Sequence, residues 1–91
     1  MAMIAECIEL EKERVVAALD EALQKLDAVD HEMVLDLSSL QRMDAGGLRA
    51  LEALAAAAEK KSIKLGLRGV SVEVYKVLKL MKLAPRFSFP P

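Results

Sequence analysis

The 91-residue sequence contains one cysteine, one histidine and no tryptophan, and aromatic side chains make up only 3% of it. A single cysteine excludes an intramolecular disulfide and is typical of a reducing compartment. With only one His and one Cys, no zinc site is expected from this chain alone. No apolar run reaches the length of a membrane-spanning helix, and no signal-like core is seen near the N-terminus, so we expect a cytoplasmic protein.

The scarcity of histidine also lowers the expectation of catalysis. A nucleophilic Ser or Cys would have to recruit His31, which lies in a polar segment between Asp30 and Glu32. A solvated turn residue is the simpler interpretation of that histidine, and Cys7 is interpreted as a packed small apolar side chain. We therefore predict that the protein is not an enzyme, and we expect no catalytic residue, no metal and no cofactor.

Hydrophobic residues make up 54% of the sequence and charged residues 30%, which is typical of a globular domain. We expect residues 1–91 to form one domain. The net charge of −1 conceals a polarity, because residues 1–44 carry a net charge of −7 and residues 45–91 a net charge of +6. An acidic and a basic solvated helix explain this polarity, and electrostatic steering of a partner is the alternative.

Apolar spacing predicts an order of helix, strand, helix, strand and helix, with a weaker strand before them. The expected helices span residues 10–28, 45–61 and 72–83, and the expected strands span residues 33–37, 62–67 and 3–10. Residues 87–89 either add a strand or pack as a tail. The core residues expected on the helices are Val15, Ala18, Leu19, Ala22, Leu26, Leu48, Leu51, Ala55, Ala58, Val74, Val77, Leu78 and Met81. This alternation predicts an α/β fold with crossover connections.

Asp44 and Ser71 are the expected N-caps of the second and third helices. Gly46 and Gly47 follow the first cap but do not form a phosphate-binding loop, so an anion or nucleotide site at this helix start has only weak support. The two glycines could instead serve only to let the chain pass close to a neighbouring strand. Asp36, at the end of its strand, could contact a partner, but a role in fixing the turn after the strand is the simpler interpretation.

The segment Val34-Leu-Asp-Leu-Ser38, followed after five residues by Asp44-Ala-Gly-Gly-Leu48, resembles the STAS domain. This family comprises anti-sigma-factor antagonists and the cytosolic domains of sulfate-type transporters. The resemblance covers about residues 9–89. It implies a small mixed β-sheet with helices packed on one face, and a non-catalytic interaction module that docks a protein partner. The partner-binding residues carried over from the family motif are Asp44, Ala45, Gly46, Gly47, Leu48 and Arg49.

Two departures from the family pattern matter. Phosphorylated members carry the acceptor hydroxyl two residues after the Asp, a place that Gly46 occupies here, and the preceding Ala45 also lacks a hydroxyl. In the family pattern, the position of Ser38 is that of a structural residue at the strand end. We therefore expect no phosphorylation switch at the helix start. The family also opens with two strands, whereas this chain has room for one. We expect the unpaired sheet edge to be covered by a second copy, as a homodimer, or by a partner.

The resemblance leaves two protein partners open: a kinase-type anti-sigma factor, or the ATPase of a lipid-trafficking ABC transporter to which the chain would bind as a small subunit. An anion or nucleotide binder at Gly46 and Gly47 is the alternative from another class. Lys76, Lys79 and Lys82 are interpreted as a solvated helix face. Aromatic stacking residues are scarce, so we expect no nucleic-acid binding, and we expect no direct membrane insertion.

Overall fold

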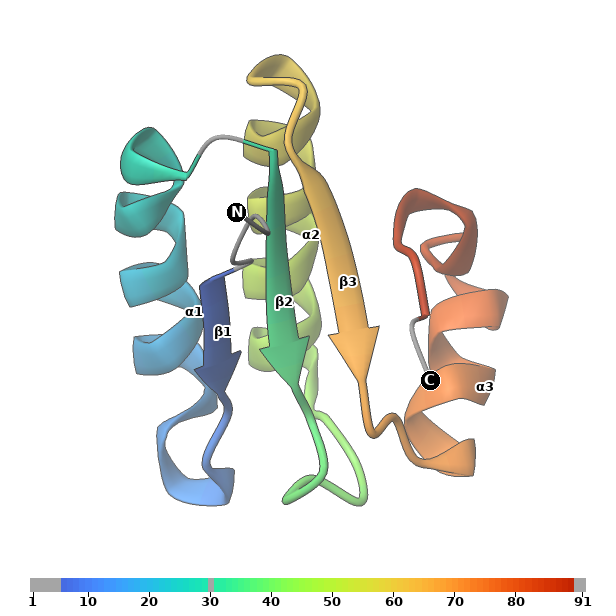
Figure 1. The fold of residues 1–91 in the computed structure, drawn as a ribbon. Coiled ribbons are helices and arrows are strands. Elements are labelled where there is room, and N and C mark those ends of the chain that lie inside the picture. Colours follow the sequence, from blue (N-terminus) through green and yellow to red (C-terminus); the bar gives the residue numbers. More distant parts are fainter. Residues whose placement is uncertain (1–5, 30, 90–91) are drawn as a thin grey trace.

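The computed structural model describes residues 6–29 and 31–89, which fold around a three-stranded sheet in the order β1-β2-β3 (Figure 1). The strands are β1 (Glu6–Glu9), β2 (Glu32–Asp36) and β3 (Lys64–Arg68). Both pairings are parallel, with Ile8 beside Leu35 and Leu35 beside Leu67. The sheet expected to be mixed is therefore parallel throughout the described strands, because a helical crossover separates each strand from the next.

The helices are α1 (Val15–Lys25), α2 (Ala45–Lys60) and α3 (Val72–Leu80), with short 3-10 turns η1 (Lys12–Arg14), η2 (Leu26–Ala28) and η3 (Ala84–Arg86). Helices α1 and α2 cover one face of the sheet, and α3 lies beside the β3 edge (Figure 1). The expected α/β fold is confirmed. None of the helices within residues 6–29 and 31–89 is long and apolar enough to cross a membrane.

The first helix is shorter than its sequence pattern indicates. Leu10 was expected both at the start of that helix and at the end of the first strand; its backbone N–H donates to the carbonyl oxygen of Asp36 at 2.9 Å and its side chain is fully buried. Leu10 therefore prolongs the sheet, and η1 turns the chain before α1 begins at Val15. Of the strand expected over residues 3–10, residues 3–5 lie outside the described residues.

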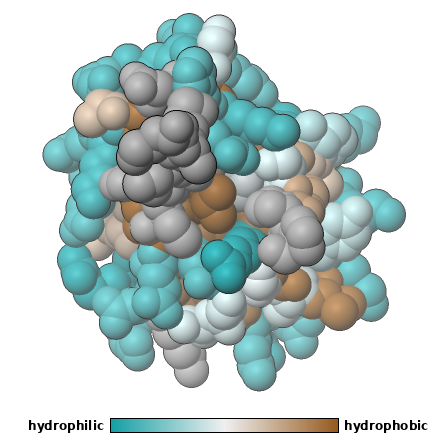
Figure 2. Space-filling model, in the orientation of Figure 1, coloured by the Kyte–Doolittle hydropathy of each residue, from teal (hydrophilic) through white to brown (hydrophobic). Residues whose placement is uncertain are grey.

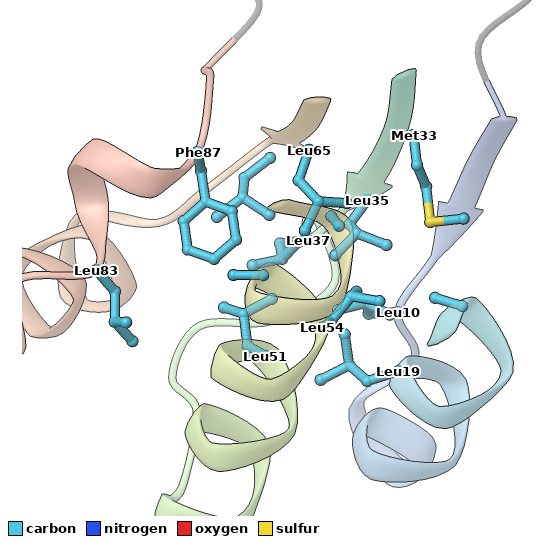
Figure 3. Packing of buried hydrophobic residues seen from close by; sticks show 14 of the residues in the cluster. Leu10, Leu19, Met33, Leu35, Leu37, Leu51, Leu54, Leu65, Leu83 and Phe87 are labelled. Atoms are coloured by element: carbon cyan, nitrogen blue, oxygen red, sulfur yellow. The ribbon is translucent and has the colours of Figure 1, made fainter. Parts of the chain in front are cut away.

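The core lies between the sheet and the helices, where leucines from both layers meet (Figure 3). Burial of the core face is confirmed for nearly all the helix residues expected there, while Val15 and Val77 are half-buried. Met81 is the exception and is 48% exposed. The expected third helix ends early, at Leu80, and Lys82 has a φ of 60°, so Met81 falls on the turn that leaves the helix.

The chain end closes the β3 side of the sheet. Ser88 accepts a hydrogen bond from the Leu67 N–H and donates one to the Leu65 carbonyl oxygen, both at 2.8 Å, and Phe87 is buried. The tail therefore both packs and forms a parallel bridge to β3. Figure 2, in the same orientation, shows mostly hydrophilic surface with small hydrophobic areas on the side of the molecule that faces the viewer.

Candidate functional site

The candidate docking site lies at the start of α2, at the end of the sheet where the parallel strands finish. The expected cap is present: Asp44 has an extended backbone, and its Oδ1 accepts the Gly47 N–H at 2.8 Å. The Asp44 carbonyl oxygen accepts the Leu48 N–H at 2.9 Å, which begins the helical hydrogen bonding. The carboxylate also lies at the positive end of the helix dipole, so it is doubly suited to this position.

The six residues expected to contact a partner divide into two groups. Asp44, Ala45, Gly46 and Arg49 are exposed, whereas Gly47 and Leu48 are buried. Leu48 is part of the hydrophobic core, so its side chain supports the helix from inside. The surface available to a partner therefore consists of the first turn of α2 and the side chain of Arg49.

The two glycines at the helix start have different surroundings. A Cβ at Gly47 would lie 2.7 Å from Cγ of Met43 and 3.2 Å from Cγ1 of Val15. A Cβ at Gly46 would meet only ordinary contacts, the nearest being Oδ1 of Asp44 at 3.6 Å. Gly47 therefore permits close packing against Met43 and α1, not against a neighbouring strand as considered from the sequence. Gly46 has room for a side chain.

The loop between β2 and α2 is anchored by Asp36, as expected. Its Oδ1 accepts hydrogen bonds from Oγ of Ser38 at 2.5 Å and from the Ser38 backbone N–H at 2.9 Å. The hydrogen bond from the Ser38 hydroxyl has the larger effect and that from the Ser38 backbone N–H the smaller one. Both hold the pKa of the Asp36 carboxyl below its ordinary value, because they favour the charged form. The Ser38 hydroxyl is thus engaged by the turn, which matches its structural interpretation.

The loop after β3 contacts the same region, a relationship that sequence analysis missed. Gly69 has a φ of +68°, and a Cβ there would lie 2.2 Å from Oγ of Ser38. Ser71 Oγ accepts the Val74 N–H at 3.2 Å, as the expected cap of α3, and donates to the Gln41 carbonyl oxygen at 2.8 Å. The starts of α2 and α3 are therefore held together by direct contacts between their preceding loops.

Two open hollows border the start of α2. One, of about 680 Å³, is lined by residues 38–42, and the other, of about 430 Å³, is lined by Glu13, Val15, Val16, Arg42, Met43 and Asp44. Arg42 lines both hollows. Its Nε lies 3.9 Å from Oε2 of Glu73 on α3, in an exposed ion pair. The surface around the helix start is thus uneven and mixed in chemistry, which suits contact with another protein surface.

The groups considered for other chemistry lie elsewhere. His31 is exposed and directly precedes β2. It therefore lies at the start of that strand, whereas Asp44 follows the loop that leaves the end of the strand. The described residues contain no cluster of three or more His, Cys, Asp or Glu side chains that could hold a metal ion. Cys7 lies in β1, and its side chain is outside the described part of the structure.

Comparison with known proteins identifies the same family as the sequence motif. The family model described as "Mlab, STAS domain" matches residues 10–85. Six chains among solved structures are significantly similar. One is the crystal structure of a candidate anti-sigma factor antagonist from Thermotoga maritima, with a TM-score of 0.73 and 17% identity over 96% of this chain and 74% of that chain. That likeness establishes the fold alone. No curated protein sequence is significantly similar to this chain.

Proposed function

Since the chain belongs to the STAS domain family, we propose that it is a non-catalytic interaction module that docks a protein partner through Asp44–Arg49 at the start of α2. In this proposal the chain acts like an anti-sigma-factor antagonist without a phosphorylation switch at that site. The observation that carries the proposal is the exposed first turn of α2, which is capped by Asp44 and preceded by a loop that is hydrogen-bonded to Ser71 at the start of α3. A preformed surface reduces the entropy lost on binding.

The side chains at the helix start support the proposed absence of a switch. Ala45 and Gly46 have no hydroxyl, and the Ser38 hydroxyl is hydrogen-bonded to Asp36. Phosphorylation would add about −1.5 to −2 charges and disrupt a partner surface by repulsion and desolvation. Because residues 45 and 46 offer no hydroxyl to accept a phosphate, the charged side chains of the docking surface remain those of Asp44 and Arg49. Binding is then constitutive.

Two partner classes fit this surface. A kinase-type anti-sigma factor would be bound by a chain that it cannot phosphorylate at residue 46. The ATPase of a lipid-trafficking ABC transporter would hold the chain as a permanent small subunit. The missing hydroxyl at Gly46 favours the second class, because a permanent subunit needs no phosphorylation cycle. Capture of the partner from the source cell, with its identification by mass spectrometry, separates the two classes.

The competing function, an anion or nucleotide site at Gly46 and Gly47, is less well supported. The Gly47 N–H is already taken by Asp44, whose carboxylate stands at the helix start. An anionic ligand placed there would meet a like charge. Nucleotide or phosphate titration monitored by NMR shifts of the Gly46 and Gly47 amides tests this alternative, and saturable shifts would favour it.

The outer edge of β1 is the proposed contact surface for a second copy. Within the described strands, β1 pairs with β2 on one side only. The β3 edge, by contrast, is bridged by Ser88. An unpaired edge is normally protected, so we propose that a homodimer contact covers the β1 side.

A charge placed at Gly46 tests the docking proposal. Gly46→Glu introduces a negative side chain where a Cβ meets only ordinary contacts, so the fold should tolerate it. We expect the affinity for the captured partner to fall at least about tenfold. Ala56→Glu is the matched control, since Ala56 is exposed on the same helix away from its start. Equal binding by the two variants would contradict docking at the start of α2.

Restoring the hydroxyl separates the two partner classes. Gly46→Ser fits the same space and recreates the acceptor position of the phosphorylated family members. If the captured partner is a kinase-type anti-sigma factor, we expect it to phosphorylate Gly46→Ser but not the wild-type chain. An ABC-transporter ATPase should bind both forms equally and modify neither. Phosphorylation of the wild-type chain at Ser39 would overturn the proposal that binding is not controlled by phosphorylation.

A further inference from the structure

Exposed large hydrophobic side chains occur on two separate surfaces among the described residues. The first is on α1, where Val16 is 52% exposed and Leu23 is 36% exposed. The second is on α3 and the tail that follows it, and it comprises Val72, Tyr75, Leu80, Met81 and Phe89. Helix α1 flanks the β1 side of the sheet and α3 flanks the β3 side (Figure 1). The two surfaces therefore lie on different helices, one on the β1 side and one on the β3 side of the sheet.

The α3 face, defined here as Val72, Tyr75, Lys76, Lys79 and Leu80, is hydrophobic and basic. Leu80 is 82% exposed and Val72 is 70% exposed, one at each end of the helix. Tyr75 packs edge-on against Phe89, with ring centroids 5.3 Å apart, and Lys79 Nζ lies 5.8 Å from the Tyr75 ring centroid. Neither lysine forms an ion pair with a described residue, so their charges are available to a partner.

The α1 face, defined here as Val16, Asp20 and Leu23, is hydrophobic and acidic. With Ala50 and Ala53 of α2, these residues line a shallow groove of about 370 Å³. Asp20 forms no ion pair with a described residue and accepts only a long hydrogen bond, of 3.5 Å, from Gln24. The neighbouring Glu21 is already paired with Arg14 at 3.2 Å. Asp20 therefore carries the uncompensated charge at the centre of this face.

We infer that the α3 face of one copy packs on the α1 face of the next copy. The inference goes beyond the proposed contact at the β1 edge, because the groove that receives α3 is formed by α1 and α2. The two faces match in pattern: Val16, Asp20 and Leu23 run apolar, acidic and apolar, and Val72, Lys76 and Leu80 run apolar, basic and apolar. At 1.5 Å per residue both patterns span roughly 10 to 12 Å, in either relative direction of the helices.

This contact is head-to-tail, because each copy contributes a different surface. Such an interface joins further copies into a ring or a chain, whereas pairing of β1 with β1 would stop at a symmetric dimer. The occupant is a second copy because the chain itself presents both complementary faces, one acidic and one basic, on opposite sides of the sheet. An α3 helix seated on this face would lie in the groove that α1 forms with α2.

Charge reversal with sedimentation equilibrium tests the inference. We expect the wild-type chain to self-associate with a dissociation constant between about 1 μM and 1 mM, more weakly at high salt. Asp20→Lys alone, or Lys76→Glu with Lys79→Glu alone, should weaken association at least about tenfold, while an equal mixture of the two variants restores it. Glu52→Lys, an exposed reversal on α2, is the control and should change little.

The outcomes separate this contact from the alternatives. A chain that stays monomeric at about 1 mM, or one whose association survives both reversals, overturns the inference. Variants that each dimerise normally and gain nothing on mixing would point to a symmetric β1 edge. Circular dichroism confirms that each variant is folded. Partner binding through Gly46 is measured separately, so failure of self-association is distinguishable from failure of the docking proposal.

Discussion

Arg86 donates two hydrogen bonds to the carboxylate of Glu59, from Nε to Oε2 at 2.9 Å and from Nη2 to Oε1 at 2.8 Å. This bidentate pair joins η3 to the last part of α2. Paired planar groups of this kind hold their geometry better than single-contact surface ion pairs do. The pair therefore fastens the chain end, including the bridge at Ser88, to the helix behind the sheet.

We expect Arg86→Gln to lower the free energy of unfolding in a pH-dependent way. The hydrogen bonds from Arg86 hold the pKa of Glu59 below its ordinary value. A lowered folded-state pKa stabilises the fold above the unfolded pKa of about 4.3, and the contribution is lost as the pH falls through the folded pKa. Urea unfolding should therefore show the largest difference between the two proteins near neutral pH, and that difference should shrink as the pH falls below about 4.3. Lys60→Gln, a change at the next residue, should show no such trend.

Asp44 has two roles that substitution can separate. We expect Asp44→Ala to cost about 1 kcal/mol of stability, because the Gly47 N–H loses its side-chain partner. Asp44→Asn keeps an oxygen acceptor for the cap and removes the charge, so thermal unfolding should change little. If the charge contributes to docking, Asp44→Asn binds the partner more weakly at unchanged stability. A large loss of stability in Asp44→Asn would contradict the assigned capping geometry.

Gly69 and Gly46 should respond oppositely to alanine. Gly69→Ala places a Cβ 2.2 Å from Oγ of Ser38 on a backbone with positive φ, so we expect a destabilisation above about 1 kcal/mol. Gly46→Ala adds a methyl group that meets only ordinary contacts within a helix, and should stabilise by roughly 0.4 to 1 kcal/mol. Chemical denaturation of both variants measures the contrast. A tolerated Gly69→Ala would mean that the loop after β3 can rearrange.

A buried leucine of α2 and an exposed leucine of α3 should differ sharply in their effect on stability. Leu51 is fully buried in the core and Leu80 is 82% exposed. We expect Leu51→Ala to cost about 2 to 5 kcal/mol through lost burial and a cavity, whereas Leu80→Ala changes stability by less than about 0.5 kcal/mol. Calorimetry gives both values under one set of conditions. Leu80→Ala should at the same time weaken self-association, which a merely solvated residue would not do.

Local sequence signals predicted most of the secondary structure, because caps and apolar spacing act within a few residues. Asp44 is the cap that the sequence predicts, and α2 begins at the next residue, Ala45. The buried residues of that helix follow the predicted apolar spacing. The pattern left Leu10 ambiguous, because its spacing fits both a helix start and a strand end. The distant carbonyl oxygen of Asp36 decides between them. The parallel direction of both strand pairings also depends on contacts between segments far apart in the chain, so local spacing did not predict it.

The candidate site was predicted in part, for a related reason. Asp44, Ala45, Gly46 and Arg49 follow directly from the motif and are exposed. The contact of Gly69 with Ser38, and that of Ser71 with Gln41, join segments far apart in the chain. No local pattern encodes such contacts. A glycine just after a strand and a serine at a helix start were the signals that could have drawn attention to this second loop.

The all-parallel pairing of β1, β2 and β3 has a consequence for how the chain reaches this structure. Neighbouring strands are joined only through a helix, so no two-strand hairpin exists among them to form early and locally. Each pairing must first close a loop that contains an entire helix, and that entropy is lost before the strands gain their contacts. We expect slower folding than in a helical bundle of similar length, and little persistent structure in fragments that end before β3.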